Sequence, residues 1–181
     1  MTTSTRLTAQ SVQFPHIPTQ GVEEAVDSVI SLLQARLNDV IDRISENYKM
    51  AVGRIDLPHI MPSHYYTSEV VEPWEPPACF VIADKSDADL RGQNVDIQVH
   101  PMLVIVVIEG VDDVIRMVRR TWRMGLALRT VLRDVSFHNI HCIWKGADYS
   151  PIYTRKGESG TRHFRKDVTV RLDVHQYEAM P

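Results

Sequence analysis

Two short groups of residues carry side chains of types that could do chemistry. The segment Lys156-Gly-Glu-Ser-Gly-Thr161 has the glycines, lysine and hydroxyls of a phosphate-binding loop, but it lacks the order GxxxxGK[ST] and the strand-to-helix context. His138, His141 and Cys142 are close in sequence, yet in a strand His138 and His141 point to opposite faces and would not share a metal. No Gly-x-Ser-x-Gly elbow occurs. We therefore expect no catalytic residues, no metal and no cofactor.

Clustered arginines offer a different chemistry, the binding of acidic partners. Residues 111–135 have a charge balance of +3 and contain six arginines, which are Arg116, Arg119, Arg120, Arg123, Arg129 and Arg133. On a helix, Arg116, Arg120 and Arg123 share one face, and Arg119 lies beside it. Three interpretations remain open for this face: a solvated helix side, a subunit interface, or contact with DNA phosphates.

A second basic segment, residues 150–166, has a balance of +4, and its candidates are Arg155, Lys156 and Arg162. It is either a functional surface or an exposed hairpin tip. Residues 67–96 have a balance of −5, and the candidates for this acidic edge are Glu69, Glu72, Glu75, Asp84, Asp87 and Asp89. A protein with one basic and one acidic edge can associate head to tail, and such contacts close into a ring when the rotation permits. The net charge of −3 argues against a general nucleic-acid coat.

Two helices are predicted to position these charges. Apolar residues recur at steps of three and four from Val22 to Met50, which predicts one helix of about 29 residues and ~43 Å. Asp112 or Asp113 can cap a second helix that runs to about Val135. Its broad apolar side is expected to consist of Ile115, Val118, Trp122, Leu126 and Leu128 to Leu132. Gly125 is expected to mark a close approach to the sheet.

The remaining pattern predicts strands. Ala78–Ala83 and Val95–Ile108 form an antiparallel hairpin, joined by a polar loop at Asp84–Asn94. Ile140–Tyr149 is a further strand, followed by a loop at Ser150–Arg162. Phe164–Tyr177 alternates apolar and polar residues, as a strand with one wet face does.

The expected fold class is α+β, with a mainly antiparallel sheet packed by a long N-terminal helix and a second, Arg-rich helix in the order α-β-β-α-β-β. Residues 1–20 are expected to be a flexible arm, and residues 21–178 a single domain with a Pro-rich excursion at 53–77. That excursion has one possible strand, Tyr65–Val71, and Trp74 in it either anchors a neighbour or covers its own loop. Cys79 and Cys142 are expected to be buried, reduced thiols. The longest apolar run, Met102 to Ile108, is far short of the ~20 residues that span a bilayer, so no membrane partner is expected.

These elements resemble the tail terminator (tail completion) proteins of tailed bacteriophages, from the head-to-tail joining region. Three parts carry the resemblance across residues 22–178. The first is the long helix Val22–Met50. The second is the apolar strand followed by the Glu109-Gly-Val-Asp-Asp113 turn and a helix with Trp122 and closely spaced arginines. The third is the closing pair of strands, with Gly146-Ala-Asp-Tyr-Ser150 and Arg165–Tyr177.

The resemblance implies a structural virion protein without catalytic residues. It would form a ring, commonly a hexamer, at the head-proximal end of a tail, where it ends tail-tube polymerisation and joins the tail to the head connector, with DNA passing through the lumen. Its partners would be itself, the tail tube protein, the head-tail connector or neck protein and, transiently, genomic DNA; it would be assembled in the host cytoplasm and located in the virion. The alternatives are a neck or head-completion protein of the same machine and a sequence-independent nucleic-acid-binding protein.

Overall fold

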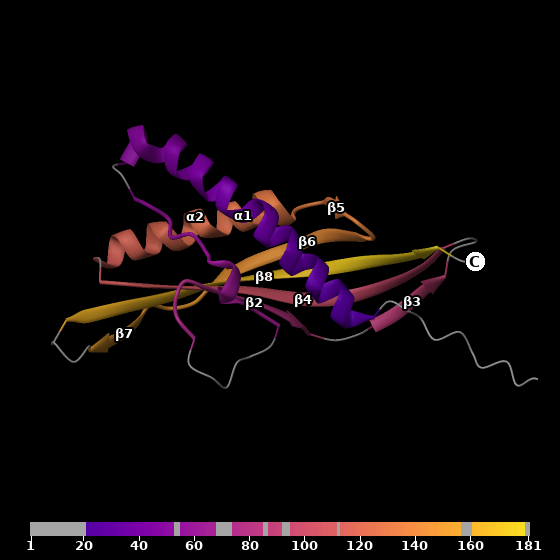
Figure 1. Cartoon of the computed structure of the whole chain (residues 1–181). Coiled ribbons are helices and arrows are strands. Elements are labelled where there is room, and N and C mark those ends of the chain that lie inside the picture. Colours follow the sequence, from indigo (N-terminus) through magenta and orange to yellow (C-terminus); the bar gives the residue numbers. More distant parts are fainter. Residues whose placement is uncertain are drawn as a thin grey trace, which may run out of the picture.

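A computed structural model describes residues 21–52, 55–67, 74–84, 87–91, 95–111, 113–156 and 161–179. In this part of the chain, the helices α1 (Val22–Val52) and α2 (Val114–Leu132) lie on one face of an eight-stranded sheet (Figure 1). The strands pair antiparallel apart from one two-residue parallel pair. The predicted α+β class, with a long first helix and an Arg-rich second helix on a mainly antiparallel sheet, is confirmed.

The sheet has four long and four short strands. They are β1 (Tyr65–Tyr66), β2 (Ala78–Ala83), β3 (Asp87–Arg91), β4 (Val95–Gly110), β5 (Val135–Phe137), β6 (Ile140–Tyr149), β7 (Tyr153–Lys156) and β8 (Arg162–Ala179); the 3-10 turn η1 (Pro62–His64) precedes β1. The spatial order is β1-β2-β4-β8-β6-β5, while β3 pairs with β4 and β7 with β8 outside this path. The predicted six-element order was therefore incomplete, because it lacked the four short strands.

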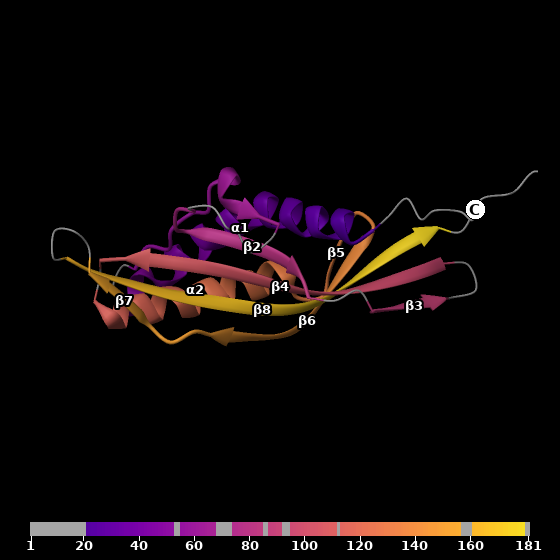
Figure 2. The same cartoon turned by 90° about the horizontal axis from the view of Figure 1, so that it is seen from below.

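The longest ladder joins β4 and β8. All 16 residues of β4 have a partner in β8, from Val95 opposite Ala179 to Gly110 opposite Phe164. At one end, where Val95 pairs with Ala179, this ladder extends past the helices (Figure 2). At the other end, β4 stops beside the start of α2, and the beginning of β8 extends past it together with β7. Strand β3 pairs with the beginning of β4, and β7 pairs with the beginning of β8, so the two short strands lie at opposite ends of the molecule.

Helix α1 begins at Val22, as predicted, and continues two residues beyond Met50. It buries the predicted apolar stripe, including Leu33, Leu37 and Ile41, against α2 and the sheet. The Asn38 amide then fixes the segment after the helix, because its Nδ2 donates to the Ile60 carbonyl at 3.1 Å and its Oδ1 accepts the Ile60 N–H at 3.1 Å. In the described part of the chain, no helix combines the length and apolar character that crossing a membrane requires.

Helix α2 starts at a capped end. The Asp113 carboxylate accepts the backbone N–H of Arg116 at 2.8 Å, which satisfies one of the open N–H groups of the first turn. The helix ends at Leu132 instead of Val135. Asp134 adopts a left-handed conformation, with φ of 49°, which reverses the chain and lets Val135 start β5.

Two segments predicted as loops contain strands instead. Strand β3 lies within Asp84–Asn94, and β7 lies within Ser150–Arg162. Both sequences are polar, and their backbones are paired with the projecting ends of β4 and β8. Charged residues on short edge strands also discourage pairing with foreign strands.

The other strand predictions hold with small changes. Strands β2 and β6 have the predicted bounds, while β4 and β8 are longer than predicted. Of the expected strand Tyr65–Val71, the first two residues form β1, and residues 68–73 lie outside the described residues. The expected arm at residues 1–20 lies outside them as well.

The main core lies between the helices and the sheet. Val106 of β4 is fully buried there, and Cys79 and Cys142 are buried, free thiols as predicted. A smaller cluster around Phe80 lies on the reverse face of β2. The Trp74 ring packs edge-on against Phe80 at 5.5 Å between centroids, so Trp74 covers part of β2, the strand that follows it.

Candidate assembly interface

A row of large side chains on α2 points away from the core. We call the row Ile115, Arg119, Trp122, Leu126 and Arg129 the α2 stripe; its members follow one another at steps of four, three, four and three residues. Ile115 is 63%, Trp122 57% and Leu126 38% exposed. The predicted apolar side of the helix is therefore buried only in part: Leu128, Val131 and Leu132 lie in the core, whereas Ile115, Trp122 and Leu126 do not. The core instead takes the opposite side of α2, with Met117, Met124, Leu128 and Val131.

The stripe borders a hollow where α2 meets the end of α1. The hollow has a volume of about 250 Å³, and its lining residues are Tyr48, Arg119, Trp122, Arg123 and Leu126. Tyr48 comes from the last turns of α1 and is 37% exposed. Aromatic and aliphatic walls with an arginine at the rim are typical of surfaces that anchor a partner protein.

Gly125 brings the sheet close to the stripe. The ring of Tyr149, from β6, lies where a side chain at position 125 would be, with its Cε1 3.1 Å from an ideal Cβ there. This confirms the predicted close approach between α2 and the sheet. Burial against the helix raises the pKa of Tyr149, although 41% of the residue remains exposed beside the stripe.

Two of the predicted interface arginines are bound to the chain's own backbone. Arg123 is 7% exposed; its Nη1 donates to the Ile55 carbonyl at 3.1 Å, and its guanidinium lies 4.7 Å from the centre of the Tyr48 ring. Arg120 donates from Nε to the Asp56 carbonyl at 3.0 Å. Burial lowers the pKa of Arg120, and the charge of Asp56 offsets part of that effect. Both side chains attach the 55–56 segment to α2.

The other four arginines differ in how they are paired. Arg116 lies 3.6 Å from the Asp113 carboxylate, and Arg133 lies 3.3 Å from Asp134. Among the described residues, the guanidinium groups of Arg119 and Arg129 make no hydrogen bond, ion pair or ring contact. These two are also the basic members of the α2 stripe, on either side of Trp122 and Leu126.

The second basic group gathers on the β7–β8 hairpin. Lys156 lies opposite Arg162 and Arg155 opposite His163, so the structure brings the three predicted residues Arg155, Lys156 and Arg162 together at one end of the molecule. All three are exposed. The hairpin and the beginning of α2 lie at the same end (Figure 1).

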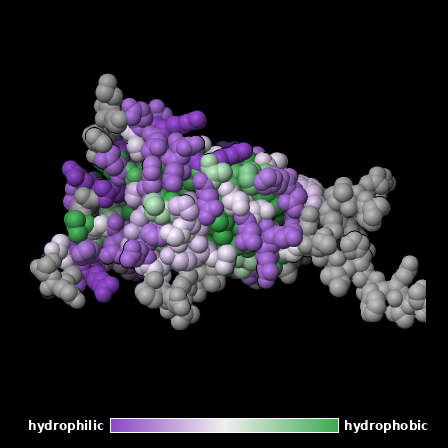
Figure 3. Space-filling view, viewed as in Figure 1, coloured by the Kyte–Doolittle hydropathy of each residue, from purple (hydrophilic) through white to green (hydrophobic). Residues whose placement is uncertain are grey.

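Exposed acids lie on α1 as well as on the predicted acidic edge. Of its six candidates, Glu75 and Asp84 are exposed, Asp87 and Asp89 lie on β3, whose backbone alone is described, and Glu69 and Glu72 are outside the described residues. Among the α1 residues whose side chains are described, six further acids are exposed, against the two exposed bases Arg36 and Arg43; the acids are Glu23, Glu24, Asp27, Asp39, Asp42 and Glu46. Figure 3 shows the exposed face of α1 as mostly hydrophilic.

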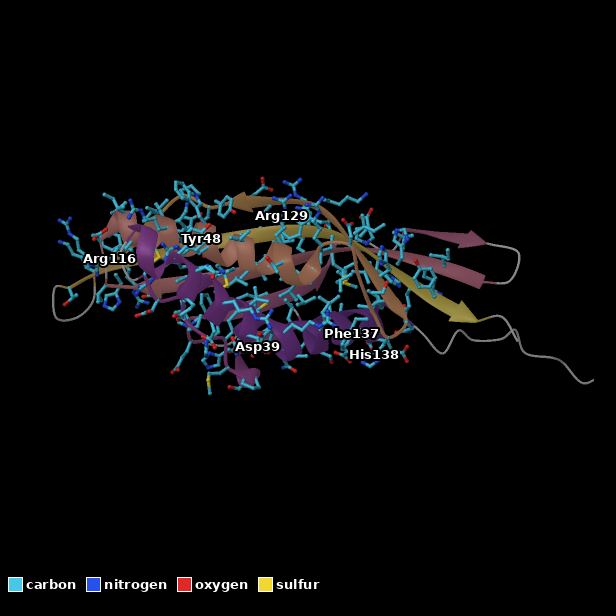
Figure 4. All side chains as sticks on the ribbon, turned by 90° about the horizontal axis from the view of Figure 1, so that it is seen from above. Asp39, Tyr48, Arg116, Arg129, Phe137 and His138 are labelled. Atoms are coloured by element: carbon cyan, nitrogen blue, oxygen red, sulfur yellow. The ribbon has the colours of Figure 1, made fainter. Side chains whose placement is uncertain are left out.

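The α1 and α2 surfaces lie on opposite flanks of the helix layer. Figure 4 shows Asp39 on the α1 flank and Arg129 on the α2 flank, with both helices between them. The acidic α1 face was not predicted, although acids recur along the α1 sequence from Glu23 to Glu46.

The residues that suggested metal or phosphate chemistry have other surroundings. Cys142 is buried, while His141 Nδ1 lies 3.0 Å from Ser136 Oγ and the His138 ring packs on Phe137 in a turn. Within the described ranges, no group of three or more His, Cys, Asp or Glu side chains is placed to hold a metal ion. Residues 157–160 of the glycine-containing segment lie outside those ranges.

No protein-family model matches the chain, and no curated protein matches it. Among solved structures, the chain is similar to a chain of the "Virion of native gene transfer agent (GTA) particle", with 18% sequence identity over 82% of this chain and 98% of that chain. The TM-score of that match is 0.32, too low to indicate a shared fold or role.

Proposed function

We propose that this protein is a structural virion protein that forms a ring at the head-proximal end of a phage tail. In that position it ends tail-tube polymerisation and joins the tail to the head connector, and DNA passes through the lumen. The motifs that resemble tail terminator proteins motivate the tail position, and a hexamer is the ring size that this resemblance implies. The protein acts by binding other subunits and makes no covalent bond.

One observation supports self-assembly above all others: the helix layer has an acidic flank and a basic flank. The acids lie on the outward face of α1, and Arg119 and Arg129 lie on the outward face of α2. Complementary charges on opposite sides of one molecule favour head-to-tail contacts, because the basic side of each copy meets the acidic side of the next. Repetition of such a contact gives a closed ring when the rotation between copies divides a full turn.

The two basic groups serve different partners in this proposal. The α2 stripe has apolar side chains between its arginines, which suits a protein surface better than a row of phosphates. The candidates for the wall of the lumen through which DNA passes are the exposed hairpin residues Arg155, Lys156 and Arg162. A small number of exposed charges suits moving DNA, since each further phosphate contact adds salt-dependent affinity.

The experiment is to measure the mass of the purified full-length protein by light scattering at moderate salt, with and without tail-tube protein, and to image the assemblies by electron microscopy. We expect rings that cap one end of each tube. A strict monomer in both samples would overturn the proposal. Rings that bind the connector but not the tube would instead favour the neck or head-completion role.

A second candidate function, sequence-independent nucleic-acid binding, is favoured by the exposed basic hairpin. It predicts that the protein retards DNA at low salt and that affinity falls steeply as salt rises. The substitutions Arg155→Glu and Lys156→Glu should then abolish the shift. If the unmodified protein does not retard DNA at low salt, this function is excluded.

A further inference from the structure

We infer that the α2 stripe of one copy binds the outward face of α1 of the next copy. This inference rests on the ring proposed above and specifies the contact between its subunits. The contact uses Arg119 and Arg129, whose guanidinium groups make no hydrogen bond, ion pair or ring contact among the described residues. It also uses the exposed Trp122 and Leu126 between them.

The spacing of the α2 stripe is that of a helix-packing seam. Steps of four, three, four and three residues average 3.5, the repeat with which two helices stay in contact along their length. On the buried side α2 already packs against α1 of its own chain and the sheet. The stripe on the opposite side therefore has the pattern for a second helix partner.

The outward face of α1 complements the stripe in order as well as in charge. This face has a row of exposed residues at steps of four, which are Asp27, Ser31, Ala35 and Asp39. Small side chains in the middle leave room for a large aromatic group, and the acids lie toward the two ends.

The α2 stripe has the matching order of cation, Trp122, Leu126 and cation. The spans agree as well. Arg119 and Arg129 are separated by about 15 Å along α2, and Asp27 and Asp39 by about 18 Å along α1, at 1.5 Å rise per residue. Arginine side chains are long enough to bridge the difference.

The two parts of the contact have different roles. Exposed Arg–Asp pairs add little affinity but select the orientation and the partner. Removal of Trp122 and Leu126 from water supplies most of the stabilisation. The contact is heterologous, because each copy uses α2 on one flank and α1 on the other, so it propagates around a ring and does not end in a dimer.

The test uses charge reversal on each flank. The first variant carries Arg119→Glu and Arg129→Glu, and the second carries Asp27→Lys and Asp39→Lys. Arg120 and Arg123 are left unchanged because they bind the 55–56 backbone. Each variant alone presents like charges at every contact, so we expect at least a tenfold weaker association by analytical ultracentrifugation, with unchanged circular dichroism.

A 1:1 mixture of the two variants distinguishes a broken contact from a misfolded protein. In the mixture, the acidic stripe of the first variant meets the basic α1 face of the second, and the basic stripe of the second meets the acidic α1 face of the first. Every contact in an alternating ring is then complementary, so assembly should return to within about twofold of the unmodified protein. A single chain with all four substitutions should assemble for the same reason. Arg43→Glu is the control: it makes on α1 the same single Arg→Glu reversal that Arg119→Glu makes on α2, but it leaves the α1 face acidic and should not weaken assembly.

Normal assembly of both single-flank variants would overturn the inference, and so would a mixture that fails to restore rings. Both results are compatible with a ring built through another surface, and they leave the proposed function intact. An unmodified protein that stays monomeric with tail-tube protein present would overturn both the inference and the proposed function.

Discussion

Replacement of Arg123 by alanine tests whether this residue is part of the fold or part of the interface. Its guanidinium donates to the Ile55 carbonyl and lies over the Tyr48 ring. A hydrogen bond from a charged group contributes about 1.5–3 kcal/mol, and a cation–π contact at a partly exposed ring about 0.5–1 kcal/mol. We therefore expect Arg123→Ala to lower the free energy of unfolding by roughly 2–4 kcal/mol, the sum of these two effects.

The assay is urea unfolding followed by circular dichroism, with the midpoint and slope compared between variants. In a protein of this size, that loss corresponds to a decrease in Tm of about 4–16 °C. Arg119→Ala is the matched control, because it removes the same side chain one turn earlier, where the guanidinium makes no hydrogen bond, ion pair or ring contact among the described residues. It should change stability by no more than about 0.5 kcal/mol. Equal, small effects at both positions would refute the structural role assigned to Arg123.

Val106→Asp should prevent folding, because an unpaired carboxylate in the core costs several kcal/mol; the same substitution at exposed Val111 should leave cooperative unfolding intact by circular dichroism. Burial raises the pKa of both thiols, that of Cys142 to about 12, so at pH 8 neither Cys79 nor Cys142 should react with a thiol reagent before unfolding, and rapid native labelling would contradict their burial. Burial also lowers the pKa of His175, so stability should fall as pH drops below the ordinary value of 6.5 and level off once the folded protein is protonated too; urea midpoints at pH 7.5, 6.5 and 5.5 measure this slope, which His175→Asn should reduce.

The sequence was sufficient for the elements with a strong period and a buried face. The stripe of α1 and the alternation Val168, Val170, Leu172 and Val174 in β8 each have one side that must leave water. Strand β2, only six residues long, was also predicted with correct bounds, because it is apolar throughout and follows a proline pair.

The short strands could not be predicted because their own residues do not specify them. In β7, every residue is exposed, and its pairing with Arg162–Arg165 depends on the projection of β8 beyond the helices. Strand β3 likewise pairs with the beginning of β4. Such pairing is a tertiary effect that a local pattern does not record.

The candidate interface was predicted only in part, because tertiary contacts decide which arginines are exposed. A run of arginines on α2 was evident, but composition does not tell which of them the chain itself binds. Arg123 and Arg120 reach backbone carbonyls at positions 55 and 56, more than 60 residues away in sequence. Trp122 was assigned to the apolar side of the helix because of its residue type. The apolar residues of α2 extend around more of the helix than the core covers, so Trp122 remains exposed.

The ladder between β4 and β8 continues past the helices at the end where Val95 pairs with Ala179, so that end is a single-layered ribbon. A hydrogen-bonded ribbon without a packed layer opens locally at much lower free energy than the centre of the sheet. Amide protons of Val95–Val99 should therefore exchange with deuterium faster than those of Val104–Ile108. The molecule would then combine a stiff middle with one compliant end, formed by β3 and the parts of β4 and β8 that pass beyond the helices.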